Sequence, residues 1–430
     1  MKPLFGQVAR GSIQSLIVRL SGLAVAFLQA ILTARLLGAE GYGQVAVALS
    51  VAQIVATVSM FGFGPLAVRE VAKFRAVKNA SAEANFNRLA LTVVLTLSLL
   101  ACAVLAILGS IGGIVSADYA RPTALAALLV PPLALIALLR GIACGRGRIV
   151  RSQLPGEVVR QSLMTTSLLL VILFGFSIGP QKYIAITAIS ASVAALVAYI
   201  LTLRREIRSV PFRIDILAGA QIRQAMPFLG LALIGIAQGE INTLLLGALL
   251  GPQEAGLFQP IARLIPLMTL PVQAAAMRYA PIVSELWHAG ETIRFERVTR
   301  LFTLWTSALT ILLALGIAYT GNWILVLFGS EFSVGAELLW YMACAQIFNA
   351  ACGPVGALLT MTGRSNAALA GQLAGLVVNL GLGLWLIPQF GLLGAVLAMS
   401  GGIVSWNVIL LAITVRHVQF DPSLLGSLMR

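Results

Sequence analysis

The chain consists largely of apolar stretches that are long enough to cross a lipid bilayer. Twelve of them recur along the 430 residues, at 11–36, 43–68, 89–115, 123–143, 154–178, 183–203, 222–249, 257–282, 301–328, 336–361, 367–387 and 392–415. A bilayer core about 30 Å thick needs roughly 20 apolar residues per spanning helix. Barrel strands are excluded because they are about ten residues of alternating polarity. The sequence therefore predicts an all-α integral membrane protein with 12 transmembrane helices.

Composition limits what else the chain can contain. Hydrophobic residues make up 59% and charged residues only 10%, so no sizeable soluble domain fits between the stretches. This excludes enzymes with a large extramembrane catalytic domain. The four cysteines lie in apolar stretches without the CxxC spacing of a metal or disulfide site, and no cofactor is expected; they are Cys102, Cys144, Cys344 and Cys352.

The basic residues predict which side of the membrane holds the termini. Of the 29 lysines and arginines, 22 fall in segments on the side of the termini and three on the opposite side, and four lie inside the stretches. Loops rich in Lys and Arg stay in the cytoplasm, so both termini are expected there. This asymmetry, with contact to anionic lipid heads, also explains the net charge of +14. Nucleic acid is not an expected partner.

A short repeat relates the two halves of the chain. The segment 36–43 (LLGAEGYG) aligns with 249–256 (LLGPQEAG) at an offset of 213 residues, and each ends a first helix of a half. Six spans per half give both copies the same orientation, which indicates two six-helix bundles related by a pseudo-twofold axis along the membrane normal. The predicted domains are an N-terminal bundle at 1–203, a cytoplasmic linker at 204–222 and a C-terminal bundle at 223–430.

The hairpin around the first repeat resembles a known family. Residues 34–43 (ARLLGAEGYG), 61–64 (FGFG) and 68–72 (VREVA), with their counterparts 250–258 (LGPQEAGLF), 262–264 (ARL) and 281–284 (PIVS), are similar to bacterial polysaccharide flippases of the multidrug/oligosaccharidyl-lipid/polysaccharide exporter superfamily. The resemblance implies transport of undecaprenyl-pyrophosphate-linked oligosaccharide from the inner to the outer leaflet of the bacterial cytoplasmic (inner) membrane. Twelve spans fit O-antigen or exopolysaccharide flippases better than lipid II flippases, which have fourteen.

Four arginines lie inside the predicted spans: Arg19, Arg160, Arg263 and Arg278. Because a charge in the bilayer is costly, such residues usually face a water-filled cavity or a partner. Family members carry arginines on their first and eighth helices in a central cavity. The resemblance therefore implies substrate contact for Arg19, Arg263 and Arg278, whereas Arg160 is expected to pair with Glu157. Contact with lipid phosphates alone remains open for Arg278.

Small and polar residues follow one face of the first helix at spacings of three and four: Ser12, Ser15, Arg19, Gly22, Ala26, Gln29 and Thr33. Gln29 is a candidate substrate-binding residue on this face. The alternative is a packing seam of small residues, with Arg19 reaching toward the cytoplasm. Between Arg263 and Arg278 the eighth helix contains Pro266 and Pro271, which predict a bend.

Glu240 is the acid expected to lie deepest in the membrane, with Asn242 two residues further on as a candidate for substrate binding. Glu240 and Arg263 lie at similar depths below the turn that joins their helices and could pair. Glu240 is either half of a structural ion pair or a site for a proton or sodium ion coupled to transport. No metal site is expected.

Two other functions remain as alternatives. A drug or cation exporter of the same superfamily would need acidic groups in its cavity, but the four arginines outnumber Glu157 and Glu240. A membrane-embedded polysaccharide polymerase or ligase would need a large outward-facing loop, which this chain lacks. The sequence thus favours a non-enzymatic transporter of an anionic lipid-linked substrate, working beside a polymerase and other assembly proteins.

Overall fold

The computed structural model describes residues 2–111, 116–203 and 218–428, and these residues form helices joined by short turns. Ten helices in the described residues are long and apolar enough to cross a membrane, or eleven if the bent pair Pro252–Met268 and Leu270–Ala276 counts as one span. The longest, Leu20–Ala76, contains the predicted stretch 43–68 and most of the stretch 11–36. The all-α membrane fold is confirmed. The count of twelve spans and the pseudo-twofold axis stay predictions.

The chain divides into two compact units, Met1–Glu240 (unit 1) and Ile241–Arg430 (unit 2), with the boundary inside one helix. The predicted linker 204–222 falls mostly on residues 204–217, which lie outside the described residues. The predicted domains 1–203 and 223–430 therefore stay a prediction.

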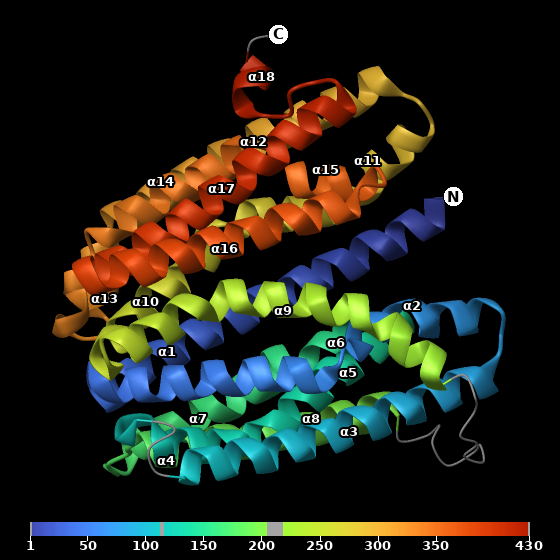
Figure 1. The fold of residues 1–430 in the computed structure, drawn as a ribbon. Coiled ribbons are helices and arrows are strands. Elements are labelled where there is room, and N and C mark those ends of the chain that lie inside the picture. Colours follow the sequence, from blue (N-terminus) through green and yellow to red (C-terminus); the bar gives the residue numbers. More distant parts are fainter. Residues whose placement is uncertain (1, 112–115, 204–217, 429–430) are drawn as a thin grey trace. The chain divides into compact units, whose positions relative to one another are not determined.

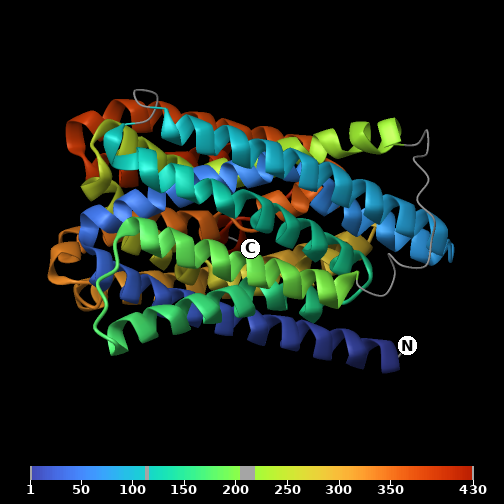
Figure 2. The same ribbon diagram turned by 90° about the horizontal axis from the view of Figure 1, so that it is seen from below.

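Unit 1 begins with the longest helix, and its later helices run alongside that helix in both views (Figure 1, Figure 2). The helix α5 packs against α2, α3 and α8, so it lies inside the unit. The elements of unit 1 are α1 (Lys2–Met60), α2 (Phe63–Ala76), α3 (Ala80–Ser110), α4 (Ala117–Ala126), the 3₁₀ turn η1 (Ala127–Leu129), α5 (Val130–Gly145), α6 (Ile149–Gln153), the π-helical segment η2 (Leu154–Val159), α7 (Arg160–Leu173), α8 (Pro180–Thr202) and the first part of α9 (Ala218–Leu249).

The first part of α9 belongs to unit 1 because it packs closely on α2. Gly62, just before α2, has a positive φ of 75°, and a Cβ there would lie 2.2 Å from the carbonyl oxygen of Ala225. Only glycine permits this approach of two backbones. The side chains add a hydrogen bond of 2.7 Å, which Arg69 Nη2 donates to Gln224 Oε1.

Unit 2 contains two long neighbouring helices, α16 and α17, which lie side by side along most of their length (Figure 1). α14 packs against both α12 and α17. The elements of unit 2 after α9 are α10 (Pro252–Met268), α11 (Leu270–His288), α12 (Thr292–Tyr319), α13 (Gly321–Val326), the 3₁₀ segment η3 (Ser330–Gly335), α14 (Leu338–Ala351), α15 (Val355–Met361), α16 (Ser365–Phe390), α17 (Leu392–Val418) and α18 (Leu424–Leu428).

The repeat predicted between the halves has a structural counterpart at matched glycines. Gly38 interrupts α1 with φ 67° and ψ 179°, and Gly251, which is 213 residues later, precedes α10 with φ 100° and ψ −178°. This region of backbone space is almost reserved for glycine. Both halves therefore turn from one helix into the next through the same kind of glycine break.

Candidate functional site

The predicted bend after the second glycine turn is confirmed. α10 ends at Met268 and α11 begins at Leu270, and the two helices meet at an angle of 42°. Pro266 lies in the last turn of α10, and Pro271 is the second residue of α11. Each proline removes a backbone donor and prevents a straight continuation of the helix. The eighth span is thus a bent arm made of α10 and α11.

The bent arm carries two of the candidate arginines. Arg263 lies on α10 and Arg278 on α11, and both side chains are exposed on the surface of unit 2. An exposed guanidinium can donate several hydrogen bonds to an anionic group such as a phosphate. The fold thus leaves both arginines accessible for binding, and their contact with substrate stays a prediction. The predicted pair between Glu240 and Arg263 joins residues of different units and also stays a prediction.

The third candidate arginine, Arg19, lies on α1, but its side chain is outside the part of the chain that the structure describes. The polar face on which it was placed can be followed further along α1. Gly22 lies against Glu157, whose carbonyl oxygen would be 3.0 Å from a Cβ at position 22. This contact places the described part of the face at a close approach of α1 to η2.

Gln29 and Thr33 continue the same face of α1 and meet α8. Gln29 Nε2 donates a hydrogen bond of 3.1 Å to the hydroxyl of Tyr183, which lies 2.9 Å from the hydroxyl of Thr33. Thr33 and Tyr183 are buried, whereas Gln29 is half-buried and its Oε1 has no partner among the described residues. These contacts fit the packing seam for this part of the face. Substrate binding by Gln29 stays a prediction.

Glu240 has a partner that the sequence reasoning missed. Ser50, in the part of α1 after Gly38, is buried and donates a hydrogen bond of 2.5 Å to Glu240 Oε2. The two residues are 190 positions apart, so only the polar character of Ser50 inside a predicted span could have drawn attention to it. The hydrogen bond holds the carboxylate of α9 against α1 within unit 1.

Asn242 lies two residues beyond Glu240 and belongs to unit 2. Its side chain is 1% exposed, and neither Oδ1 nor Nδ2 has a hydrogen-bond partner among the described residues. Such burial leaves no room for a bulky headgroup at this position without rearrangement. Substrate contact by Asn242 stays a prediction.

Glu157 forms an ion pair with another helix. Its Oε1 lies 3.1 Å from Arg140 Nη2, which joins η2 to α5. The pair expected between Glu157 and Arg160, three residues further on, stays a prediction. The pair with Arg140 was missed because the two residues belong to separate predicted spans, whose contacts have no local periodicity.

The fold is that of a known class of membrane transporter. The chain superposes on the inward-facing conformation of a multidrug resistance MATE family transporter of the MOP superfamily with a TM-score of 0.74, at 16% identity over 95% of this chain and 98% of that one. It also superposes on the lipid II flippase MurJ in an inward closed conformation with a TM-score of 0.73, at 13% identity over 97% and 91% of the two chains. A MOP superfamily transporter from Pyrococcus furiosus matches with a TM-score of 0.64, at 15% identity over 95% of each chain.

These likenesses show that the chain has the fold of MOP superfamily transporters. At the level of sequence, residues 8–287 match the family model described as polysaccharide biosynthesis protein. The chain belongs to this family. No curated protein matches it in sequence.

Proposed function

We propose that the protein flips undecaprenyl-pyrophosphate-linked oligosaccharide from the inner to the outer leaflet of the bacterial cytoplasmic membrane. Membership of a polysaccharide biosynthesis family supports a saccharide cargo, and the fold shared with MurJ and MATE proteins supports transport. The product would feed O-antigen or exopolysaccharide assembly, with a polymerase and other assembly proteins as partners. In this proposal both termini lie in the cytoplasm.

The observation that carries the proposal is the bent arm with its exposed arginines. Arg263 and Arg278 lie away from the outer ends of α10 and α11, where Glu254, Glu285 and His288 are found, and both arginines are exposed. Guanidinium groups donate paired hydrogen bonds to phosphate oxygens and stay ionised at any working pH. With Arg19, they would hold the pyrophosphate in a cationic central cavity that opens to each leaflet in turn. The reaction requires no covalent chemistry.

Glu240 is proposed as the site that couples transport to a proton or sodium ion. A carboxylate inside a membrane segment is costly and usually marks a functional site or a partner. The hydrogen bond from Ser50 of α1 holds the carboxylate of Glu240 against that helix. The competing assignment is a structural role in tying α9 to α1.

The test is transport by the purified protein in proteoliposomes with a fluorescent undecaprenyl-pyrophosphate-linked oligosaccharide. An impermeant quencher reports the fraction of lipid in the outer leaflet. We expect Arg19→Ala combined with Arg263→Ala to lower the rate at least about tenfold, because each charge-assisted hydrogen bond contributes about 1.5–3 kcal/mol. Folding and membrane insertion should be unchanged.

The matched control is Arg294→Ala, which removes an exposed arginine paired with Glu291 at the start of α12. This variant should transport at the wild-type rate. Full activity of the double variant would contradict the cationic cavity. Transport of organic cations, with no flipping of the saccharide lipid, would instead assign the protein as a drug or cation exporter.

A further inference from the structure

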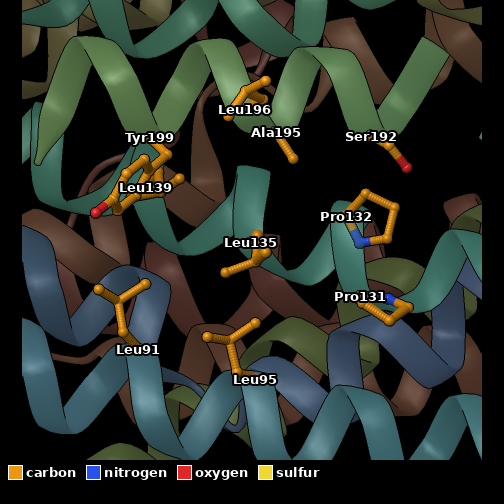
Figure 3. Close-up of a pocket in the computed structure, with 10 residues that line it drawn as sticks. All are labelled: Leu91, Leu95, Pro131, Pro132, Leu135, Leu139, Ser192, Ala195, Leu196 and Tyr199. Carbon is orange, nitrogen blue, oxygen red and sulfur yellow. The ribbon is translucent and has the colours of Figure 1, made fainter. Parts of the chain in front are cut away.

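Unit 1 contains an apolar pocket of about 540 Å³ between three helices. Figure 3 shows Leu91 and Leu95 of α3 on one side, α8 on the other, and Leu135 of α5 between them. Pro131 and Pro132 close one end of the pocket, directly after the 3₁₀ turn η1 interrupts the span. Pockets of this size and apolar lining are typical of sites for small or chain-like ligands.

The pocket has a buried floor and an exposed mouth. Leu139 of α5 and Ala195 of α8 are only 1% and 6% exposed. Leu196 and Tyr199, which also lie on α8, are 58% and 37% exposed. Among the described residues that line it, Ser192 and Tyr199 carry a hydroxyl group, and Ser192 donates its hydrogen to the carbonyl oxygen of Ala188. The interior therefore offers almost nothing to a polar ligand.

The mouth opens on a surface suited to hydrocarbon. Large exposed side chains near the lining residues on α3 and α8 are apolar, among them Leu99, Ile189 and Val193. In a membrane protein such a surface contacts lipid chains. A ligand that reaches the pocket from this surface would be a hydrocarbon chain from the bilayer.

The end of the pocket at Leu91 and Tyr199 is suited to a lipid with a polar head. Arg88 lies three and seven residues before Leu91 and Leu95, so the three side chains share one face of α3. Arg88 is half-buried and lies about 10 Å along the helix from Leu95. Tyr199 lies three residues before the end of α8, at the level where amphipathic aromatic rings meet lipid heads. In the proposed topology, this end faces the cytoplasm.

We propose that this pocket binds the isoprenoid tail of the lipid-linked substrate in the cytoplasmic leaflet, with its phosphate group near Arg88. The inference rests on the proposed function for the identity of the lipid. The pocket holds one chain and opens toward the leaflet in which the substrate is made. Its position within unit 1 keeps the tail in an apolar environment while the polar head is free to move.

Photolabelling tests the proposal. The purified protein in nanodiscs of phosphatidylethanolamine and phosphatidylglycerol is mixed with polyprenyl phosphate that carries a diazirine in its chain and no sugar. We expect labelled peptides from α3, α5 or α8, and loss of label when unlabelled undecaprenyl phosphate is added. The same amount of additional phosphatidylglycerol should leave the label unchanged. Equal competition by the phospholipid would assign the pocket to ordinary acyl chains and overturn the proposal, as would labelling only elsewhere.

Ala195→Phe should fill the pocket and lower labelling about tenfold, equivalent to about 1.4 kcal/mol of binding. The matched control is Leu201→Phe, which adds the same ring on α8 away from the pocket. Arg88→Gln should weaken labelling by polyprenyl phosphate but not by the corresponding polyprenol. Retention of full labelling in Ala195→Phe would contradict the site. If the wild type binds the tail but flips no saccharide lipid, the pocket stands and the proposed function fails.

Discussion

The two units differ in where their ion pairs lie. In unit 1, ion pairs join separate elements: Arg146 Nε lies 2.7 Å from Glu83 Oε1 of α3, and Arg140 of α5 pairs with Glu157 of η2. The ion pairs that the structure describes in unit 2, Arg294 with Glu291 and Arg300 with Glu296, are local to the start of α12.

Hydrogen bonds between uncharged groups join helices in both units: Gln29 of α1 binds Tyr183 of α8 in unit 1, and two further examples lie in unit 2. Asn407 of α17 donates to Asn349 Oδ1 of α14 at 2.9 Å, and Ser307 of α12 donates to the carbonyl oxygen of Ala350 at 3.0 Å. Ser307 and Asn407 lie in the interior of α12 and α17, whereas Arg146 directly follows the end of α5. We expect ion pairs mainly near helix ends, since an unbalanced charge in the hydrocarbon is costly. Depth along the helix thus decides which chemistry a contact uses.

The largest effect is expected for Arg146→Met. The Arg146 side chain is 2% exposed, and its Nη1 also donates to the carbonyl oxygen of Thr202 at the end of α8. Its removal leaves Glu83 nearly buried without its charge partner, which costs about 3–5 kcal/mol. The unfolding free energy in mixed detergent, followed by the loss of the helical circular dichroism signal, measures the effect.

Two further variants make that result specific to the buried pair. The double variant Arg146→Met with Glu83→Leu should recover part of the stability, because no unpaired charge is left. Arg294→Met should change it by less than about 1 kcal/mol, as exposed pairs contribute little. Equal losses for Arg146→Met and Arg294→Met would remove the distinction drawn between buried and exposed pairs.

The sequence predicted the local features of this fold and missed its long-range contacts. The helices α8 and α17 lie close to the predicted stretches 183–203 and 392–415, because bilayer thickness sets the length of an apolar run. The repeat around Gly38 and Gly251 and the bend near Pro266 were also readable, because each depends on a few neighbouring residues.

Contacts between helices depend on packing that no local pattern encodes. Arg146 was assigned only to the cytoplasmic charge count, although it forms a buried pair with a residue 63 positions away. Ser50 and Tyr183 were not singled out, yet they bind the side chains of Glu240 and Gln29. The candidate site was therefore predicted as a set of residue types, without the partners that orient them.

A second prediction tests a feature that both units share. Gly251→Ala should cost about 1–3 kcal/mol, because φ 100° with ψ −178° is a region in which side-chain-bearing residues are strained. No atom lies within 4 Å of the added Cβ, so the cost comes from the backbone alone. Gly38→Ala should lose stability for the same reason in unit 1.

The control for the glycine turns is Gly316→Ala in α12, where a Cβ also meets no atom within 4 Å but the backbone is helical. It should be neutral or slightly stabilising, since alanine favours helix over glycine. Thermal unfolding midpoints rank the three variants. A Gly251→Ala variant as stable as Gly316→Ala would mean that the protein in solution does not hold Gly251 in this strained backbone conformation.

The smallest effect is expected for Asn407→Leu, which removes the uncharged link between α17 and α14. Hydrogen bonds between membrane helices contribute on average about 0.6 kcal/mol and at most about 1.7 kcal/mol. The loss should therefore be several times smaller than that of Arg146→Met, even though Asn407 is 1% exposed. Ser405→Ala is the matched control on α17, because Ser405 donates only to Gly401 of its own helix. If Asn407→Leu costs as much as Arg146→Met, then uncharged links in the membrane interior are as important as buried ion pairs at helix ends, and depth no longer explains the difference between the units.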